Sequence, residues 1–90
     1  MWEIYEKKPL TRKLAKIPKQ ILKRYEIWKR IVELDGLSGL RRIKGFHDEA
    51  LQGIWKGCRS SRLSLQWRVI YKVEQNQLQV FVIDINPHEY

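Results

Sequence analysis

The chain has 90 residues, of which 43% are hydrophobic, and its formal net charge is +8. This length predicts one domain over residues 1–90, and the hydrophobic fraction excludes an intrinsically disordered chain. The only cysteine, Cys58, excludes an intramolecular disulfide framework, leaves too few Cys/His ligands for a zinc cluster, and fits a reducing cytoplasm. No long apolar run lies near the N-terminus, so we expect neither a signal peptide nor a membrane span.

The first half of the chain predicts one short strand followed by two basic helices. Apolar and charged residues alternate in residues 1–6, which is typical of an edge strand. A helix is expected over 10–16, and Pro18 suits the first turn of a second helix that ends at Gly36. The apolar stripe of this second helix is predicted to face the core. It comprises Ile21, Tyr25, Trp28 and Val32, widened by Leu22, Ile27, Ile31 and Leu34.

The second half predicts strands. Residues 37–46 are punctuated by glycines and indicate a loop, and residues 47–51 begin either a strand or a single helical turn. From 62 to 73 the apolar residues alternate with period two, which predicts one strand. Residues 74–77 suit a hairpin turn, and 78–85 are apolar on both faces, as in a central strand. The fold class is therefore α+β: an αα-hairpin or bent helix packed on a curved antiparallel sheet.

The charge predicts an anionic partner, which leaves nucleic acid, an acidic protein or an anionic membrane surface open. Strand alternation places Arg62 and Arg68 on one side of the predicted strand, and Arg59 directly precedes it. Guanidinium groups bind phosphate oxygens in bidentate fashion, so this strand is a candidate phosphate-binding surface. The alternative is an exposed sheet face whose cations resist edge-to-edge aggregation.

The end of the chain adds groups that transfer protons. Pro87 is followed by His88 and Tyr90, and pairing of the last two strands would bring His88 near Arg62. Histidine changes charge near neutral pH, so His88 is a candidate general acid or base, with a plain surface role as the alternative. Glu49 is a candidate base or else a salt-bridge or loop-capping partner. His47 is interpreted as a surface residue.

These residues resemble the RelE/ParE superfamily of bacterial toxins over residues 40–90. The resemblance rests on Glu49-Ala50-Leu51, on Gly57, on Arg62 through Arg68-Val69-Ile70-Tyr71, and on the terminal His88 and Tyr90. It is greatest with the mRNA interferase branch that includes RelE and YoeB. The resemblance implies catalytic roles for Glu49, Arg68, His88 and Tyr90. It implies that Lys56, Arg59 and Arg62 bind RNA phosphates.

The resemblance implies the toxin of a type II toxin–antitoxin system. Its activity would be cleavage of mRNA in the ribosomal A site without a metal or cofactor, giving a 2′,3′-cyclic phosphate and a 5′-hydroxyl. Its implied partners are a cognate antitoxin, the ribosome and mRNA, with no membrane among them and with operator DNA bound only through the antitoxin complex. Two alternatives are a ParE-like inhibitor of DNA gyrase that cleaves nothing and a non-toxic basic RNA-binding module.

Overall fold

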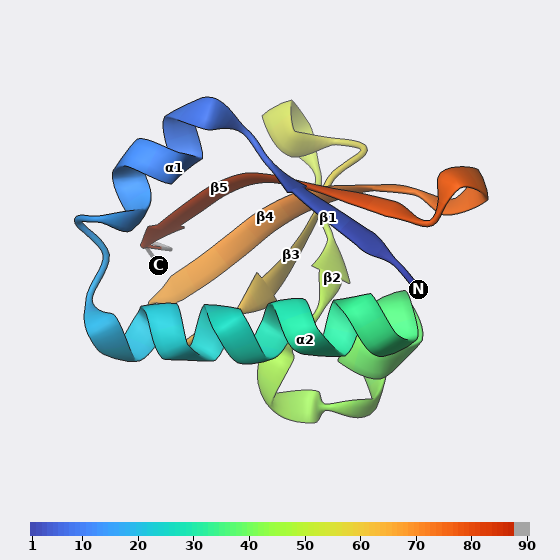
Figure 1. Cartoon of the computed structure of the whole chain (residues 1–90), viewed down its shortest axis with the longest axis horizontal. Helices are drawn as coiled ribbons and strands as arrows, with labels where there is room; N and C mark the ends of the chain where they lie inside the picture. Colours follow the sequence, from blue (N-terminus) through green and yellow to red (C-terminus); the bar gives the residue numbers. More distant parts are fainter. Residues whose placement is uncertain (88–90) are drawn as a thin grey trace.

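The computed structural model describes residues 1–87, which form a five-stranded sheet and two helices (Figure 1). His88 and Tyr90 lie outside the described residues. No helix within 1–87 is both long enough and apolar enough to cross a membrane. The strands are β1 (Glu3–Glu6), β2 (Glu49–Ala50), β3 (Arg59–Arg62), β4 (Trp67–Glu74) and β5 (Gln79–Pro87), and the helices are α1 (Lys8–Leu14) and α2 (Lys19–Arg42).

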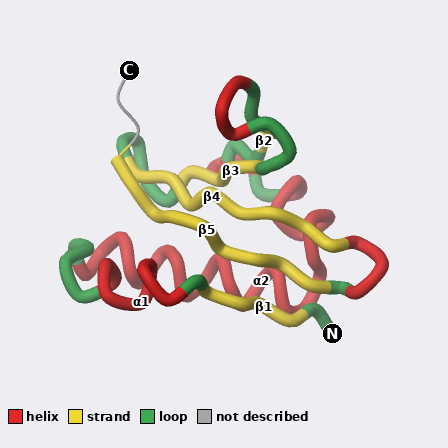
Figure 2. The backbone as a smooth tube through the Cα atoms, turned by 90° about the horizontal axis from the view of Figure 1, so that it is seen from above, coloured by secondary structure: helices red, strands yellow, loops and turns green. Residues whose placement is uncertain are grey.

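The strand order in the sheet is β1-β5-β4-β3-β2. The four strands of the second half pair antiparallel in sequence order, whereas β1 pairs in parallel with β5. The predicted α+β architecture is confirmed, with the addition that the N-terminal strand extends the antiparallel sheet into a mixed one. Figure 2 shows the sheet from above, with β1 at one edge and β2 at the other.

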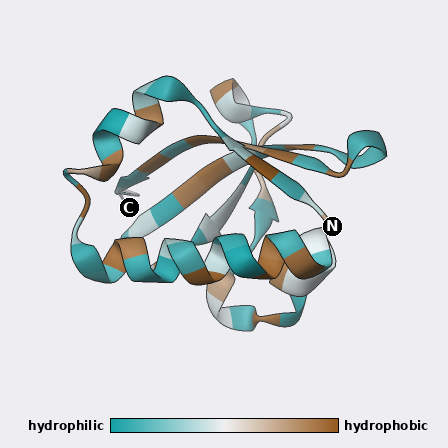
Figure 3. Cartoon of the chain, viewed as in Figure 1, coloured by the Kyte–Doolittle hydropathy of each residue, from teal (hydrophilic) through white to brown (hydrophobic). Residues whose placement is uncertain are grey.

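The main core lies between α2 and the sheet. Hydrophobic segments alternate with hydrophilic ones along α2, and the middle of β4 is hydrophobic (Figure 3). The central stripe of α2 is buried as predicted, but the widening of the stripe is wrong at Ile27 and Leu34, which are 50% and 55% exposed. The two residues are seven positions apart and lie on one exposed face of the helix. The buried stripe comprises Ile21, Tyr25, Trp28 and Val32.

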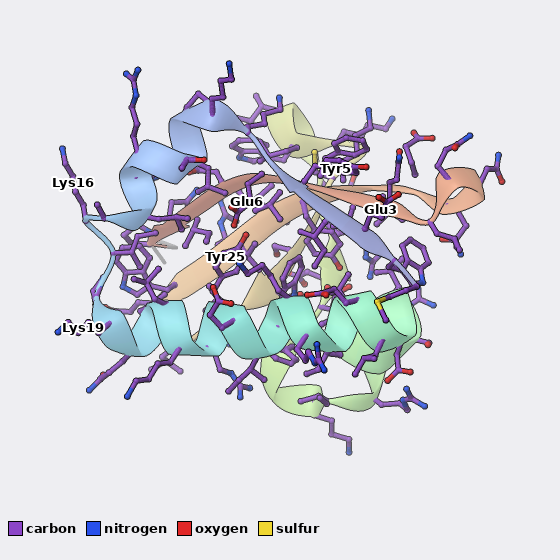
Figure 4. All side chains as sticks on the ribbon, viewed as in Figure 1. Glu3, Tyr5, Glu6, Lys16, Lys19 and Tyr25 are labelled. Atoms are coloured by element: carbon purple, nitrogen blue, oxygen red, sulfur yellow. The ribbon has the colours of Figure 1, made fainter. Side chains whose placement is uncertain are left out.

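A polar contact ties α2 to the edge strand β1. The Tyr25 hydroxyl donates a 2.5 Å hydrogen bond to the Glu6 carboxylate, and the two side chains meet in the space between the elements (Figure 4). Lys29 Nζ lies 3.7 Å from the same carboxylate and 4.8 Å from the Tyr25 ring centroid. Burial and the adjacent Glu6 raise the pKa of Tyr25, so this hydroxyl stays protonated as a donor. Lys16 and Lys19 point outwards instead.

Gly36 kinks α2 where the sequence predicted its end. Its φ of 63° and ψ of −148° are not helical, and the chain then resumes a helical course to Arg42. The predicted loop over 37–46 is therefore wrong for its first six residues. A side chain at Gly36 would also collide with the Trp2 indole, because a Cβ atom there would lie 2.5 Å from the ring. The kink thus needs glycine for both its dihedral angles and its close approach to Trp2.

Replacing Gly36 with alanine is expected to lower the free energy of unfolding by about 2–4 kcal/mol, from backbone strain and overpacking together. Urea denaturation followed by tryptophan fluorescence measures this loss. Gly45→Ala is the matched control, because a Cβ atom there meets only Arg24 Nη2 at 3.5 Å, an ordinary contact. Equal stability of the two variants would contradict the account of the kink.

The predicted single strand over 62–73 is wrong. A turn over residues 63–66 separates β3 from β4, closed by hydrogen bonds from the amides of Leu63 and Ser64 to the Trp67 carbonyl at 2.8 and 3.2 Å. Period-two alternation continued through this turn by chance, which is why Leu65 is 78% exposed instead of buried. The consequence is that Arg62 and Arg68 lie on neighbouring strands, where they form a direct cross-strand pair.

A β-bulge in β5 decides which residues face the core. Ile70 pairs with Asp84 and the next residue, Tyr71, pairs with Val82, so Ile83 has no partner on β4. The extra residue reverses the alternation of β5 at this point. Val82 and Ile85, three residues apart, both face the core and are fully buried. Asp84 is thereby turned to the opposite face of the sheet.

Candidate active site

The face of the sheet opposite α2 carries the candidate residues in two rows. Ser61, between the rows, marks the other face, because its hydroxyl accepts a 2.9 Å hydrogen bond from the Trp28 indole of α2. Cross-strand partners share a face, so the pairing register assigns each row. The first row runs Glu49, Ser60, Ile70 and Asp84 from β2 to β5, and the second runs Arg62, Arg68 and Asn86.

A small pocket lies over these rows, with a volume of about 20 Å³, enough for one water-sized group. It collects one carboxylate, one imidazole and two guanidinium groups, together with an indole ring. The lining residues include His47, Glu49, Ser60, Arg62, Trp67 and Arg68. The pocket therefore combines fixed positive charge with groups that can accept or donate a proton.

Two arginines stand directly opposite each other in this pocket. Arg62 and Arg68 pair across β3 and β4. The Cβ atoms of such a pair are about 5 Å apart, so both guanidinium groups can reach one bound anion. The pair is thus suited to a phosphodiester, whose oxygens match the planar fork of arginine.

His47 is a pocket residue that the sequence interpretation treated as ordinary surface. It follows the 3-10 turn Lys44–Phe46 in the left-handed conformation, with a φ of 47°. Positive φ is uncommon outside glycine and marks a local strain that recurs at functional sites. This conformation turns the chain so that His47 and Glu49 line the same pocket. The one feature of the sequence that could have identified His47 as a site residue is its position two residues before Glu49.

Asp48, between these two residues, anchors the segment from the other face of the sheet. Its side chain is 1% exposed and accepts hydrogen bonds from Arg59 Nη2 at 2.7 Å and Arg59 Nε at 2.9 Å. Ser61 Oγ donates to it at 2.6 Å, and the Tyr71 hydroxyl donates as well. A buried carboxylate with this set of donors fixes the backbone on both sides of it. Asp48 therefore positions the entry to β2.

The pKa values of two donors reflect this arrangement. Burial, and then the charge of Asp48, raise the pKa of Tyr71, so its hydroxyl stays a donor. Burial of Arg59 lowers the pKa of its guanidinium, but the hydrogen bond to Asp48 and the charge of that carboxylate outweigh it and the net pKa is raised. The sequence pointed to Arg59 as a cation but missed its partner Asp48.

The structure brings some of the expected site residues together and leaves others apart. Glu49, Arg62 and Arg68 share the pocket. Arg59 lies on the α2 side, engaged by Asp48, and Lys56 is exposed after the 3-10 turn Gly53–Trp55, away from the pocket lining. The positions expected for His88 and Tyr90 fall outside the described residues. Within 1–87 no three His, Cys, Asp or Glu side chains converge as a metal site would require.

Comparison with known proteins gives the fold its class. No family model matches the chain, and no curated protein matches it in sequence. Several solved structures match it in fold. The archaeal RelE–RelB complex from Pyrococcus horikoshii OT3 contains a chain that is 24% identical, with a TM-score of 0.75 over 96% of this chain and 93% of that one. The chain thus has the fold of the RelE/ParE toxins.

Two further structures support the same class. YafQ from Escherichia coli strain BL21(DE3) is 18% identical, with a TM-score of 0.76 over 97% of this chain and 93% of YafQ. The YoeB–YefM toxin–antitoxin complex from Staphylococcus aureus contains a chain that is 14% identical, with a TM-score of 0.69 over 100% of this chain and 99% of that one. Each match spans nearly the whole of both chains, so the likeness covers the complete fold.

Proposed function

We propose that the chain is the toxin of a type II toxin–antitoxin pair and that it cleaves mRNA on the ribosome. The observation that carries this proposal is the pocket in which Glu49 faces the cross-strand pair Arg62 and Arg68. A plain RNA-binding surface needs cations but no carboxylate among them, because a carboxylate repels phosphate. A carboxylate beside two arginines is instead what proton abstraction next to a phosphate requires.

The reaction that fits these groups is attack by the RNA 2′-hydroxyl on the adjacent phosphorus. Glu49 takes the proton of the 2′-hydroxyl as the bond from the 2′-oxygen to phosphorus forms. Arg68 and Arg62 stabilise the negative charge that accumulates on the phosphate oxygens in the transition state. The bond from phosphorus to the 5′-oxygen breaks, and the products are a 2′,3′-cyclic phosphate and a 5′-hydroxyl.

The departing 5′-oxygen needs a proton, and we assign its donor to a histidine. His88 is the donor that the family resemblance implies, and His47 is the histidine that lines the pocket. Replacing His47 or His88 singly with glutamine distinguishes them. Loss of the true proton donor should slow cleavage of the natural RNA, whose 5′-oxygen is a poor leaving group. It should have little effect on a substrate with an activated leaving group, which departs without a proton. Trp67, also in the pocket, offers a ring for stacking an unpaired base.

The remaining cations serve binding and support. Lys56 is exposed and available to RNA phosphates outside the pocket. Arg59 holds Asp48, so its contribution is to keep the segment before β2 in place. The strongly basic surface, including the outward Lys16 and Lys19, suits ribosomal RNA, for which charge alone gives affinity (Figure 4).

The partner we propose is a cognate antitoxin in the cytoplasm. The Staphylococcus aureus YoeB chain is solved with YefM as a toxin–antitoxin complex, and the archaeal RelE chain with RelB. An acidic antitoxin segment that folds on binding would neutralise the two pocket arginines and block entry of RNA. Operator DNA would be contacted through the antitoxin of that complex.

Replacing Glu49 with glutamine tests the assigned base. The amide keeps the shape of the side chain but cannot take a proton, so cleavage of ribosome-bound mRNA is expected to slow by about 10²–10⁴-fold. The measurement is the single-turnover rate on programmed ribosomes.

Glu74→Gln is the matched control, because Glu74 is an exposed carboxylate at the far end of β4. Its cleavage rate should equal that of the native protein. A Glu49→Gln protein that cleaves at the native rate would remove Glu49 from the mechanism.

A further inference from the structure

We propose that Asp84 and Asn86 are positioning residues that aim the Arg68 guanidinium into the pocket, and that α1 belongs to the site through Lys13. The inference rests on the proposed function, since it assigns residues that act through Arg68. None of the three contacts a substrate in this arrangement. Their effect is to fix the cation that does.

The contacts form an unbroken chain from α1 to the pocket. Lys13 Nζ lies 2.8 Å from Asp84 Oδ1. The side-chain amide of Asn86 donates to Asp84 Oδ2 at 2.8 Å, and Arg68 Nε donates to Asn86 Oδ1 at 3.2 Å. Each contact is of hydrogen-bond length, and the three connect side chains from three elements, α1, β5 and β4.

Only one assignment of donors and acceptors fits all the contacts that Asn86 makes. A carboxylate can only accept hydrogen bonds, and a guanidinium can only donate them. Asn86 lies between one of each, so its NH₂ group must face Asp84 and its oxygen must face Arg68. Asp84 therefore dictates the orientation of an amide that would otherwise be free to flip. This makes Asp84 a determinant of where Arg68 points, although the two side chains are not in contact.

The bulge at Ile83 places Asp84 and Asn86, the middle of this series of contacts, on the same face of the sheet as the pocket. Without an extra residue, Asp84 and Asn86 would continue the alternation of Val80 and Val82 and would point into the core. With it, Asn86 becomes the cross-strand partner of Arg68. Bulges commonly re-aim side chains next to active sites. Here the bulge places two polar residues behind the pocket arginine.

The use of Nε leaves the two terminal nitrogens of Arg68 to bind phosphate. An arginine side chain has about 2 kcal/mol of rotamer entropy to lose on binding, so a group that fixes it beforehand favours the transition state. Lys13 completes the arrangement by compensating the charge of Asp84. Burial raises the pKa of Asp84, but the hydrogen bonds from Lys13 and Asn86 and the charge of Lys13 outweigh it, so the pKa is lowered and the carboxylate stays an acceptor.

The test is a double-mutant cycle between Asp84→Asn and Arg68→Ala, read as the single-turnover cleavage rate on programmed ribosomes. Asp84→Asn keeps size and shape, and it should slow cleavage roughly tenfold, with little change in KM. In the Arg68→Ala background the same change should have no further effect, since its target is gone. Lys13→Met, at a side chain that is 40% exposed, should give a smaller loss of the same kind and covers the case in which Asp84→Asn does not fold.

The control is Asp35→Asn, which removes another carboxylate held by one cation, Arg42, at 3.1 Å. Its rate should equal that of the native protein. If Asp84→Asn and Lys13→Met left the native rate intact while Arg68→Ala abolished it, the positioning role would be overturned and the proposed function would stand. A loss by the same factor in both backgrounds would likewise overturn positioning through Arg68. Full cleavage by Arg68→Ala would overturn the proposed function itself.

Discussion

Replacing Arg68 with alanine is expected to slow mRNA cleavage by about 10²–10³-fold and to abolish growth arrest, because a transition-state cation is lost from a preorganised site. The side chain lies in the pocket beside Glu49 and opposite Arg62. It contributes little to the core, so the fold should persist. The expected signature is a lower rate of cleavage with an unchanged melting temperature. Rates on programmed ribosomes and circular dichroism of the purified variants measure both.

Lys72→Ala is the matched control for this prediction. Lys72 lies on the same strand as Arg68, four residues further along, so its side chain is on the same face of the sheet. Unlike Arg68, it is exposed and lies outside the pocket lining. Losing it should change cleavage only slightly, through the general attraction for RNA. Arg68→Lys should recover part of the rate, since it keeps the charge and lacks the planar fork. If a folded Arg68→Ala protein remained toxic, the catalytic assignment would be wrong.

The second large effect concerns stability. Replacing Asp48 with alanine is expected to lower the free energy of unfolding by about 3–5 kcal/mol, because it leaves the half-buried Arg59 without its counter-charge. The donors Ser61 and Tyr71 lose their acceptor at the same time. A change of this size is a large fraction of the roughly 5–15 kcal/mol by which folded proteins are typically stable. Thermal and urea denaturation measure the change.

Asp35→Ala separates this effect from the loss of any ion pair. Asp35 and Arg42 form a surface pair whose side chains are 51% and 67% exposed. Pairs of this kind contribute about 0–1 kcal/mol, so the control should denature close to the native protein. A loss of under 1 kcal/mol for Asp48→Ala as well would show that the buried network does not hold the segment before β2.

Local patterns predicted the elements well where hydrophobic periodicity matched burial. The stripe from Ile21 to Val32 and the strand residues Val69 and Tyr71 are all buried. The errors come from features that periodicity does not carry. The turn over 63–66 kept the period-two pattern, and the bulge at Ile83 changed the facing of β5 without a glycine to mark it. The parallel pairing of β1 with β5 is a long-range contact with no local signal.

The site was predictable in its charges and not in its contacts. Strand alternation placed Arg62 and Arg68 on one face, and this holds although the reason is different: they are cross-strand partners, not members of one strand. Asp48, Asn86 and Lys13 were not singled out, because their roles depend on neighbours from distant parts of the chain. A buried carboxylate has no sequence signature until its donors are known.

The most direct test of the account is to induce the chain briefly in bacteria and to map new 5′-hydroxyl RNA ends against the reading frame. We predict ends that cluster at fixed codon positions in translated mRNA and that disappear for Arg68→Ala and Glu49→Gln but not for Lys72→Ala. Growth arrest without new ends, with DNA replication stopping before translation, would contradict the account and favour inhibition of DNA gyrase.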